Sequence, residues 1–128
     1  WEGHGGAYEA PEYYWVMSRE EVPKIVGKLL AEFGLKGQEI YDFMEFWIPL
    51  MQDAPYYKVG FHGTRMMDQL APLTITPRPD SVFRILMDYT ELQEPIPANP
   101  LPQIIPFERE GFSVVEWGGV LQIEDKIQ

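Results

Sequence analysis

The sequence contains no cysteine, few basic residues and no long apolar run, and each absence excludes a class of function. Without cysteine there can be neither a disulfide nor a thiolate metal site. Ten basic side chains stand against twenty acidic ones, which gives a net charge of −10. Such an acidic surface repels phosphate backbones and anionic lipids. No segment approaches the ~18 consecutive apolar residues of a spanning helix. We therefore expect neither nucleic acid nor a membrane as the partner.

Residues that carry catalysis are also scarce. The two histidines, His4 and His62, are far apart in the sequence, and zinc catalysis needs about three protein ligands. His62 and Asp68 could contact a metal together, but we expect His62 to be a hydrogen-bonded loop histidine. No serine lies in a G-x-S-x-G motif, and no glycine-rich phosphate loop is present. We therefore predict no cofactor, no metal and no catalytic residue, and we expect a non-enzymatic protein.

What the chain does contain is typical of a single globular domain over residues 1–128. Hydrophobic residues make up 45% and aromatic residues 14% of the sequence, enough for a substantial core. The first residue is tryptophan, which suggests a processed or excised product. We divide the chain into an aromatic and glycine-rich arm (1–15), a helical part (18–51) and a mainly β part (56–128). A proline-rich strap (95–106) lies within the β part.

Two apolar stripes at helical spacing predict a pair of helices in the helical part. Ser18 and Glu21 have the spacing of a capping box, Gly34 is placed to end the first helix, and Pro49 disfavours continuation of the second. Because few residues separate the stripes, we expect the two helices to be antiparallel and to face one core. The stripes consist of Val22, Ile25, Val26, Leu29, Leu30 and Phe33, and of Ile40, Phe43, Met44, Trp47 and Ile48.

The second half of the chain is dominated by strand patterns. Residues 56–62 alternate, and residues 81–92 form the longest β-like run. Between them we predict a short helix at 64–71, capped by Thr64, and a brief strand in PLTITP (72–77). The fold class is therefore α+β: two amphipathic helices packed on an antiparallel sheet or sandwich. In the strap, prolines remove the N–H groups that a ladder needs, and we expect its apolar side chains to enter the core: Ile104, Ile105 and Phe107.

The run REGFSVVEWGG (109–119) predicts a core strand with Trp117 as its anchor, turned sharply by Gly118 and Gly119. Glu116 then lies at the rim or accepts hydrogen bonds. An alternative is a hydrolase, in which a buried Glu116 acts as a general acid with Asp88 as its partner. That chemistry requires the two carboxyl groups to lie about 5–10 Å apart.

Aromatic residues are the candidate binding residues. They can anchor into the core or into a neighbouring chain, or they can stack on sugar rings, since flat rings suit sugar faces. Most of them lie in the arm: Trp1, Tyr8, Tyr13, Tyr14, Trp15 and, from the β part, Trp117.

Three motifs in this order resemble a family of bacterial proteins without an established activity. They are the helix end FWIPLM (46–51), the strand start PRPDSV (77–82), and the closing signature R-x-G-F-[ST]-x-V-E-W-G-G, matched by residues 109–119. The resemblance begins near Val16, and the opening WEG resembles the end of a strand that follows a β-rich half in that family. It implies that this chain corresponds to the C-terminal portion of a longer protein. It implies no catalytic residue.

These observations predict a non-catalytic domain that acts by protein–protein association, either with itself or with the upstream half of a longer precursor. A sheet that lacks its upstream strands has an open edge, and open edges pair with other chains. We expect a secreted or otherwise extracytoplasmic protein. A carbohydrate-binding module is the alternative, and the hydrolase is the second alternative.

Overall fold

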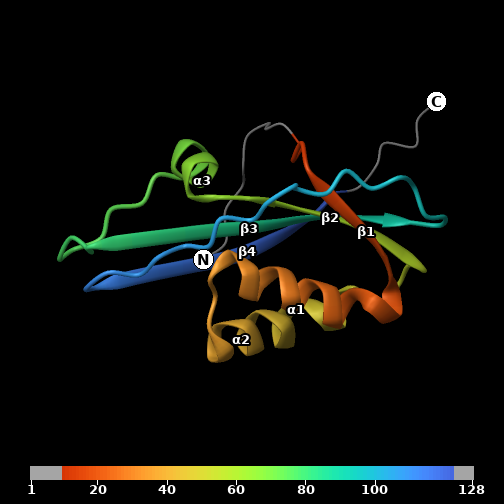
Figure 1. Ribbon diagram of the computed structural model, residues 1–128, viewed down its shortest axis with the longest axis horizontal. Helices are drawn as coiled ribbons and strands as arrows, with labels where there is room; N and C mark the ends of the chain where they lie inside the picture. The colour runs from red at the N-terminus through yellow and green to blue at the C-terminus, as the bar shows by residue number, and fades with distance from the viewer. Residues whose placement is uncertain (1–9, 123–128) are drawn as a thin grey trace.

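The computed structural model describes residues 10–122, and within them helices and strands form an α+β fold (Figure 1). This confirms the predicted fold class. Helices α1 and α2 lie together on one side of a four-stranded sheet, and α3 lies on the other side (Figure 1). The elements in chain order are β1 (Tyr14–Ser18), η1 (Arg19–Glu21), α1 (Val22–Phe33), α2 (Gly37–Trp47), η2 (Ile48–Leu50), β2 (Tyr56–His62), α3 (Thr64–Leu70), β3 (Ser81–Leu92) and β4 (Ser113–Gln122).

The helix pair forms where its caps predict. Ser18 Oγ accepts a hydrogen bond from the Glu21 N–H, and Glu21 returns one to the Ser18 N–H, which completes the capping box on η1 directly before α1. Gly34 ends α1 with φ of 111°, a left-handed conformation that glycine adopts without a Cβ clash. Pro49 lies in η2, where the α-helical hydrogen bonding of α2 has already given way to a 3-10 turn.

The sheet has the strand order β1-β2-β3-β4 and is mixed. The first two pairings are antiparallel, but β3 and β4 run parallel over ten residue pairs, from Ser81 opposite Ser113 to Thr90 opposite Gln122. A purely antiparallel sheet is therefore not what forms. Parallel neighbours need a long crossover connection, and residues 93–112 provide it by running back along the length of the molecule (Figure 1).

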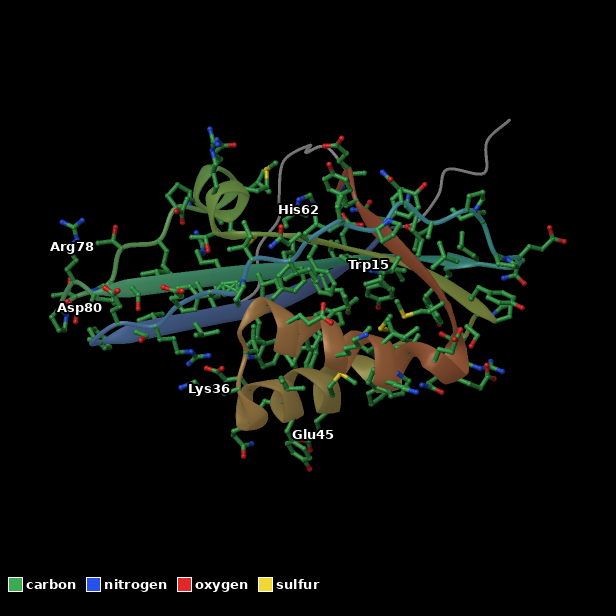
Figure 2. All side chains as sticks on the ribbon, viewed as in Figure 1. Trp15, Lys36, Glu45, His62, Arg78 and Asp80 are labelled. Atoms are coloured by element: carbon green, nitrogen blue, oxygen red, sulfur yellow. The ribbon has the colours of Figure 1, made fainter. Side chains whose placement is uncertain are left out.

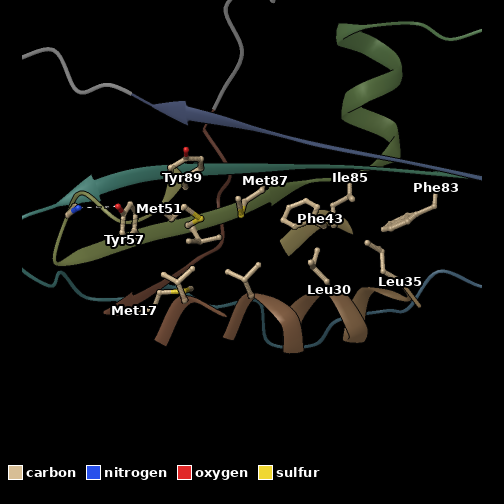
Figure 3. Packing of buried hydrophobic residues seen from close by; sticks show 14 residues of the cluster. Met17, Leu30, Leu35, Phe43, Met51, Tyr57, Phe83, Ile85, Met87 and Tyr89 are labelled. Carbon is tan, nitrogen blue, oxygen red and sulfur yellow. Dashed lines mark hydrogen bonds between the residues drawn. The ribbon is translucent and has the colours of Figure 1, made fainter. Parts of the chain in front are cut away.

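The core lies between the helix pair and the sheet (Figure 3). Alternate residues of β3 point into it, as the period of a strand requires: Phe83, Ile85, Met87 and Tyr89. Four residues of the facing stripe of α1 are buried, namely Val22, Val26, Leu29 and Leu30. Each fully buried aliphatic side chain stabilises the fold by roughly 1.5–3 kcal/mol. The Tyr57 hydroxyl accepts hydrogen bonds from the Asp53 and Ala54 N–H groups at 3.1 Å, which satisfies the one polar atom of that buried ring.

The crossover is fixed to the rest of the fold at two points near its middle and end. Asn99 exchanges both backbone hydrogen bonds with Tyr14, at 2.9 and 3.1 Å, so that it pairs with the first residue of β1 on the outer side of that strand. Further along, the Phe107 N–H donates to the Phe33 carbonyl at 2.8 Å, and the Phe107 ring stacks on Phe83 with centroids 4.9 Å apart. Phe107 thus enters the core as predicted. Ile105 does not, because its side chain is 81% exposed.

An ion pair adds a third point of attachment for the crossover. The Arg109 guanidinium donates to both carboxylate oxygens of Glu39, with Nη1 at 2.9 Å from Oε2, and to the Gly34 carbonyl at 3.2 Å. Glu39 also accepts the Lys36 N–H at the start of α2. The hydrogen bond from Arg109 is the main reason that the pKa of Glu39 lies below its usual value.

Two local predictions on the α3 side of the sheet were wrong in detail. PLTITP is not a strand; residues 72–77 form irregular chain between α3 and β3. Thr64 is the first residue of α3 and not its cap, because Gly63 occupies the cap position. The Thr64 hydroxyl instead accepts the Arg84 N–H at 2.8 Å, which ties the short helix to β3. Among residues 10–122, no helix is both long and apolar enough to span a membrane.

Candidate functional site

Strand β4 forms one edge of the sheet, and this edge is the candidate site. It is hydrogen-bonded to β3 along its whole length, and within residues 10–122 no strand lies on its other side. A strand edge presents a row of backbone N–H and C=O groups that can pair with another chain. The opposite edge differs, because β1 has only five residues and its outer side carries the bridge to Asn99.

The sequence of β4 lacks the features that protect strand edges from pairing. Proline, lysine, bulges and inward-pointing charges are the usual protection. SVVEWGGVLQ contains no proline and no basic residue, and its pairing with β3 continues without a bulge. Its one charged residue, Glu116, is directed to Arg84 of the neighbouring strand. The edge therefore has the composition of an interior strand.

An apolar rim borders this edge on the helix side. The Phe46 side chain of α2 is 57% exposed, and its ring lies 6.5 Å from that of Trp117, centroid to centroid. Leu50, in the 3-10 turn η2 that directly follows α2, is 50% exposed. Leu121 lies four residues after Trp117 in β4, so its side chain points to the same face of the sheet, and it is also exposed. We call these four residues the rim. In contrast, the exposed Glu45 points away from the sheet on the outer side of α2 (Figure 2).

Gly118 and Gly119 do not turn the strand, contrary to the prediction. Both lie inside β4 and remain in register with Leu86 and Met87, and neither has a positive φ. Their role is close packing. A Cβ on Gly119 would lie 2.8 Å from the indole ring of Trp47, whereas a Cβ on Gly118 would make an ordinary contact with Leu86. The missing side chain at Gly119 allows α2 to pack directly on the edge strand.

On the α3 side of the sheet, Arg84 is the centre of a buried ion-pair cluster. Its side chain is 1% exposed; Nε donates to Glu116 Oε1 at 2.8 Å, and Nη1 donates to Asp68 Oδ1 at 3.0 Å. Burial by itself lowers the pKa of Arg84, but the hydrogen bonds to the two carboxylates outweigh it, and the net pKa is raised. Glu116 is therefore the hydrogen-bonded carboxylate that the sequence favoured, and its partner is a buried cation.

The partner suggested for Glu116 in a hydrolase lies elsewhere on this face. Asp88 is 5% exposed, with its Oδ2 3.5 Å from His62 Nε2 and 3.1 Å from Gln122 Nε2. Arg84, directly opposite Glu116, precedes Asp88 by four residues of strand, which span about 13 Å. Glu116 is thus directed to Arg84, whereas Asp88 is directed to His62 and Gln122 further along the sheet. His62 lies beside Asp88 and not beside Asp68, which binds Arg84.

A pocket with a volume of about 330 Å³ lies at the start of β1, beside the last residues of β2. Two of the predicted binding residues, Tyr13 and Trp15, line it together with Phe33, Phe61 and His62. The Trp15 ring meets Phe61 edge to face, with centroids 6.2 Å apart. The pocket is thus a half-buried aromatic hollow and not an open row of stacked rings.

The other predicted binding residues are separated in the fold. Tyr14 points to the opposite face of β1, where Lys58 lies 4.4 Å above its ring. Trp117 packs against Phe43 of α2, with centroids 5.3 Å apart, which makes it the anchor that was predicted. Trp1 and Tyr8 lie outside the described residues.

In the described part of the chain, no group of three or more histidine, aspartate or glutamate side chains is arranged to hold a metal ion. Comparison of the sequence and structure with protein-family models, curated proteins and solved structures finds no match. The resemblance based on the three sequence motifs therefore stays a prediction, and function has to be argued from the geometry.

Proposed function

We propose that this chain is a protein-association domain that binds an extended segment of another polypeptide at the edge of β4. The observation that carries the proposal is a ten-residue edge strand without protective residues, bordered by an apolar rim. Main-chain hydrogen bonds would supply affinity, and side-chain contacts with the rim would supply specificity, as in other strand-addition complexes.

The incoming segment has to be apolar on both faces. On the helix side its side chains would contact Trp117, Leu121 and the exposed parts of Phe46 and Leu50. On the α3 side they would lie beside Val114 and Val120, which alternate with the helix-facing positions. Such a segment resembles the strands of buried parallel sheets, which read as nearly continuous apolar runs. The predicted extracytoplasmic location and the upstream half of a longer precursor as a source of this segment are part of the same proposal.

The test uses a defined strand-forming probe. It is a soluble, capped peptide that consists mainly of valine between terminal lysines, so that both faces are apolar, with two threonines for solubility and two central glycines to leave room at Trp117. The peptide is labelled for fluorescence anisotropy. Its matched control has proline in place of alternate valines, so that it cannot donate ladder hydrogen bonds. We expect saturable binding of the probe and none of the control at nanomolar protein concentration. Equal binding of both peptides, or of neither, would contradict the proposal.

A carbohydrate-binding module is a second candidate, because the pocket at the start of β1 is lined by Tyr13 and Trp15. A sugar bound there would stack on at least one ring and change the fluorescence of Trp15. A panel of oligosaccharides should then produce a saturable change that is lost in the Trp15→Ala variant. An unchanged spectrum across the panel would eliminate this candidate without affecting the first.

A further inference from the structure

The edge of β4 limits the chemistry of any strand that can pair with it. The partner needs apolar residues on both faces, little charge and no proline, for the reasons given above. It also needs small residues opposite Trp117, because that ring and the neighbouring Phe46 already fill the helix side of the edge. A partner with bulky residues at every position would therefore be excluded by overlap with these rings.

Strand β4 itself meets these requirements. SVVEWGGVLQ is apolar on both faces, its one charge is held by Arg84, and Gly118 and Gly119 supply the small residues. The other strands are paired on both sides or, like β1, paired at the first residue of the outer edge with Asn99. We propose that the occupant of the β4 edge is β4 of a second copy of this chain, paired antiparallel across a twofold axis at Gly118. This inference rests on the proposed function and names its partner.

The register follows from the alternation of the strand. In an antiparallel pair, residues directly opposite each other point to the same face of the sheet. An axis at Gly118 places Trp117 opposite Gly119 of the second copy, and Val115 opposite Leu121, all on the helix side. Glu116 then lies opposite Val120 of the second copy, so that the two Glu116 carboxylates do not face each other. Each Trp117 ring thus lies opposite a glycine, and it meets the Trp47 ring that covers Gly119 of the second copy.

The symmetry also predicts where assembly stops. A twofold interface uses the same surface on both copies, so that pairing consumes both β4 edges and joins two sheets into one. Both helix pairs then lie on the same side of the joined sheet, with the Phe46 and Leu50 side chains of the two copies near the axis. The two edges that remain are the short β1 strands, each paired at its first residue with Asn99. The expected product is a dimer and not a filament.

Charge gives the pairing a characteristic salt dependence. Each chain carries a net charge of −10, so two copies repel each other over distances comparable to the Debye length, about 10 Å at 0.1 M salt. The contact itself is apolar and contributes no new ion pair. We therefore expect the dimer to tighten when salt is raised, whereas an association held by ion pairs would weaken.

Static light scattering and a thiol cross-link test this proposal together. The chain has no cysteine, so a single Gly118→Cys substitution introduces the only thiol. Residues opposite each other in an antiparallel pair have Cα atoms about 4.5–5.5 Å apart, within the range that a disulfide bridges. Oxidation should convert G118C into a covalent dimer. Ile105→Cys, on the exposed crossover, is the matched control and should form no covalent dimer on oxidation.

A second pair of variants tests the rim without changing net charge. Phe46→Gln with Leu50→Gln removes the exposed apolar groups beside β4, and should weaken the dimer at least tenfold. Leu73→Gln with Ile105→Gln replaces two exposed side chains outside the rim, and should leave the dissociation constant unchanged. Circular dichroism of every variant confirms that it is folded before its mass is interpreted.

The outcomes separate this inference from the proposed function. A dimer that tightens with salt, with a Gly118 cross-link and sensitivity to the rim, supports self-pairing. A monomer that nevertheless binds the valine–threonine peptide overturns self-pairing and leaves strand binding intact. A monomer that binds neither peptide overturns both. A dimer in which G118C fails to cross-link, or in which I105C cross-links equally well, overturns the proposed register and with it this inference.

Discussion

Replacing Glu116 by glutamine removes one of the two negative charges that balance the buried Arg84 guanidinium. Arg84 is 1% exposed, and its second partner, Asp68, is 58% exposed and therefore largely screened by water. Breaking a buried ion pair costs about 3–5 kcal/mol when the remaining charge has no other partner. Because Asp68 remains and the glutamine oxygen can still accept from Nε, we expect a smaller loss, about 2 kcal/mol.

Urea unfolding followed by tryptophan fluorescence measures this loss at pH 7. With a slope of about 2 kcal/mol/M for a domain of this size, the midpoint should fall by about 1 M in the E116Q variant. Asp68→Asn is the matched control, since it removes the other carboxylate of the same guanidinium from an exposed position. It should cost less than about 1 kcal/mol.

A double substitution tests the physical cause. If the cost arises from a stranded cation, then Glu116→Leu combined with Arg84→Met should be less damaging than Glu116→Leu alone, because no buried charge is left behind. The reasoning would be refuted by an E116Q midpoint equal to that of the parent, or by a larger loss in D68N than in E116Q.

Three further predictions concern packing and pH. Gly119→Ala should destabilise the fold by about 1–3 kcal/mol in urea unfolding, because the new Cβ would overlap the Trp47 ring. Its control, Gly118→Ala, should change stability by less than about 0.5 kcal/mol, and equal effects of the two variants would contradict the packing role of Gly119. Gly34→Ala should lower the free energy of unfolding by more than about 1 kcal/mol and make the crossover more sensitive to proteolysis. The reason is that Gly34 has a positive φ and that the new Cβ would lie 2.8 Å from the Phe107 carbonyl oxygen of the crossover. An unchanged rate of proteolysis would contradict this prediction. The pKa of Glu39 is lower in the folded state than in the unfolded state, so its ionised carboxylate stabilises the fold above the unfolded-state pKa, and this stabilisation disappears as pH falls through the folded-state pKa. The Glu39→Gln variant should therefore lose less stability on acidification below about pH 4.5 than the parent does. An unaltered dependence of stability on pH would argue against this ion pair.

Much of the helical half could be predicted because its signals are local. The capping box at Ser18, the left-handed Gly34 and the two apolar stripes each depend on residues within a few positions of one another. These short-range rules held, and the helices formed with the predicted bounds to within a few residues.

The β half was predicted less well because pairing depends on distant segments. Strand β3 was recognised from its alternation, but its parallel pairing with β4 was not. The 20 residues between the two strands were the missed signal, because a connection of that length permits a crossover that a tight turn does not. The strand predicted in PLTITP does not form for a related reason, because a short β-like run becomes a strand only where the edge of a sheet is available for pairing.

The candidate site was identified in part. The sequence indicated that Trp117 would be an anchor, and this feature is found in the fold. The open edge was expected from strands missing upstream, which stays a prediction; the edge on which the present proposal rests is that of β4. It gave no sign that Gly118 and Gly119 lie within a straight strand, because glycine pairs occur at turns and at close contacts alike. The rim was missed because exposure of Phe46 and Leu50 depends on how far α2 extends over the edge strand.

The most direct test of the central claim is amide hydrogen exchange of residues 113–122, measured by NMR at low protein concentration with and without the valine–threonine peptide. In a strand, alternate backbone N–H groups point to opposite sides, so that one set pairs with β3 and the other points to the edge. The account predicts that the edge set exchanges fast in the free chain and becomes protected when the peptide, or a high concentration of the chain itself, is present. Exchange of the edge set that stays fast under all these conditions would contradict it.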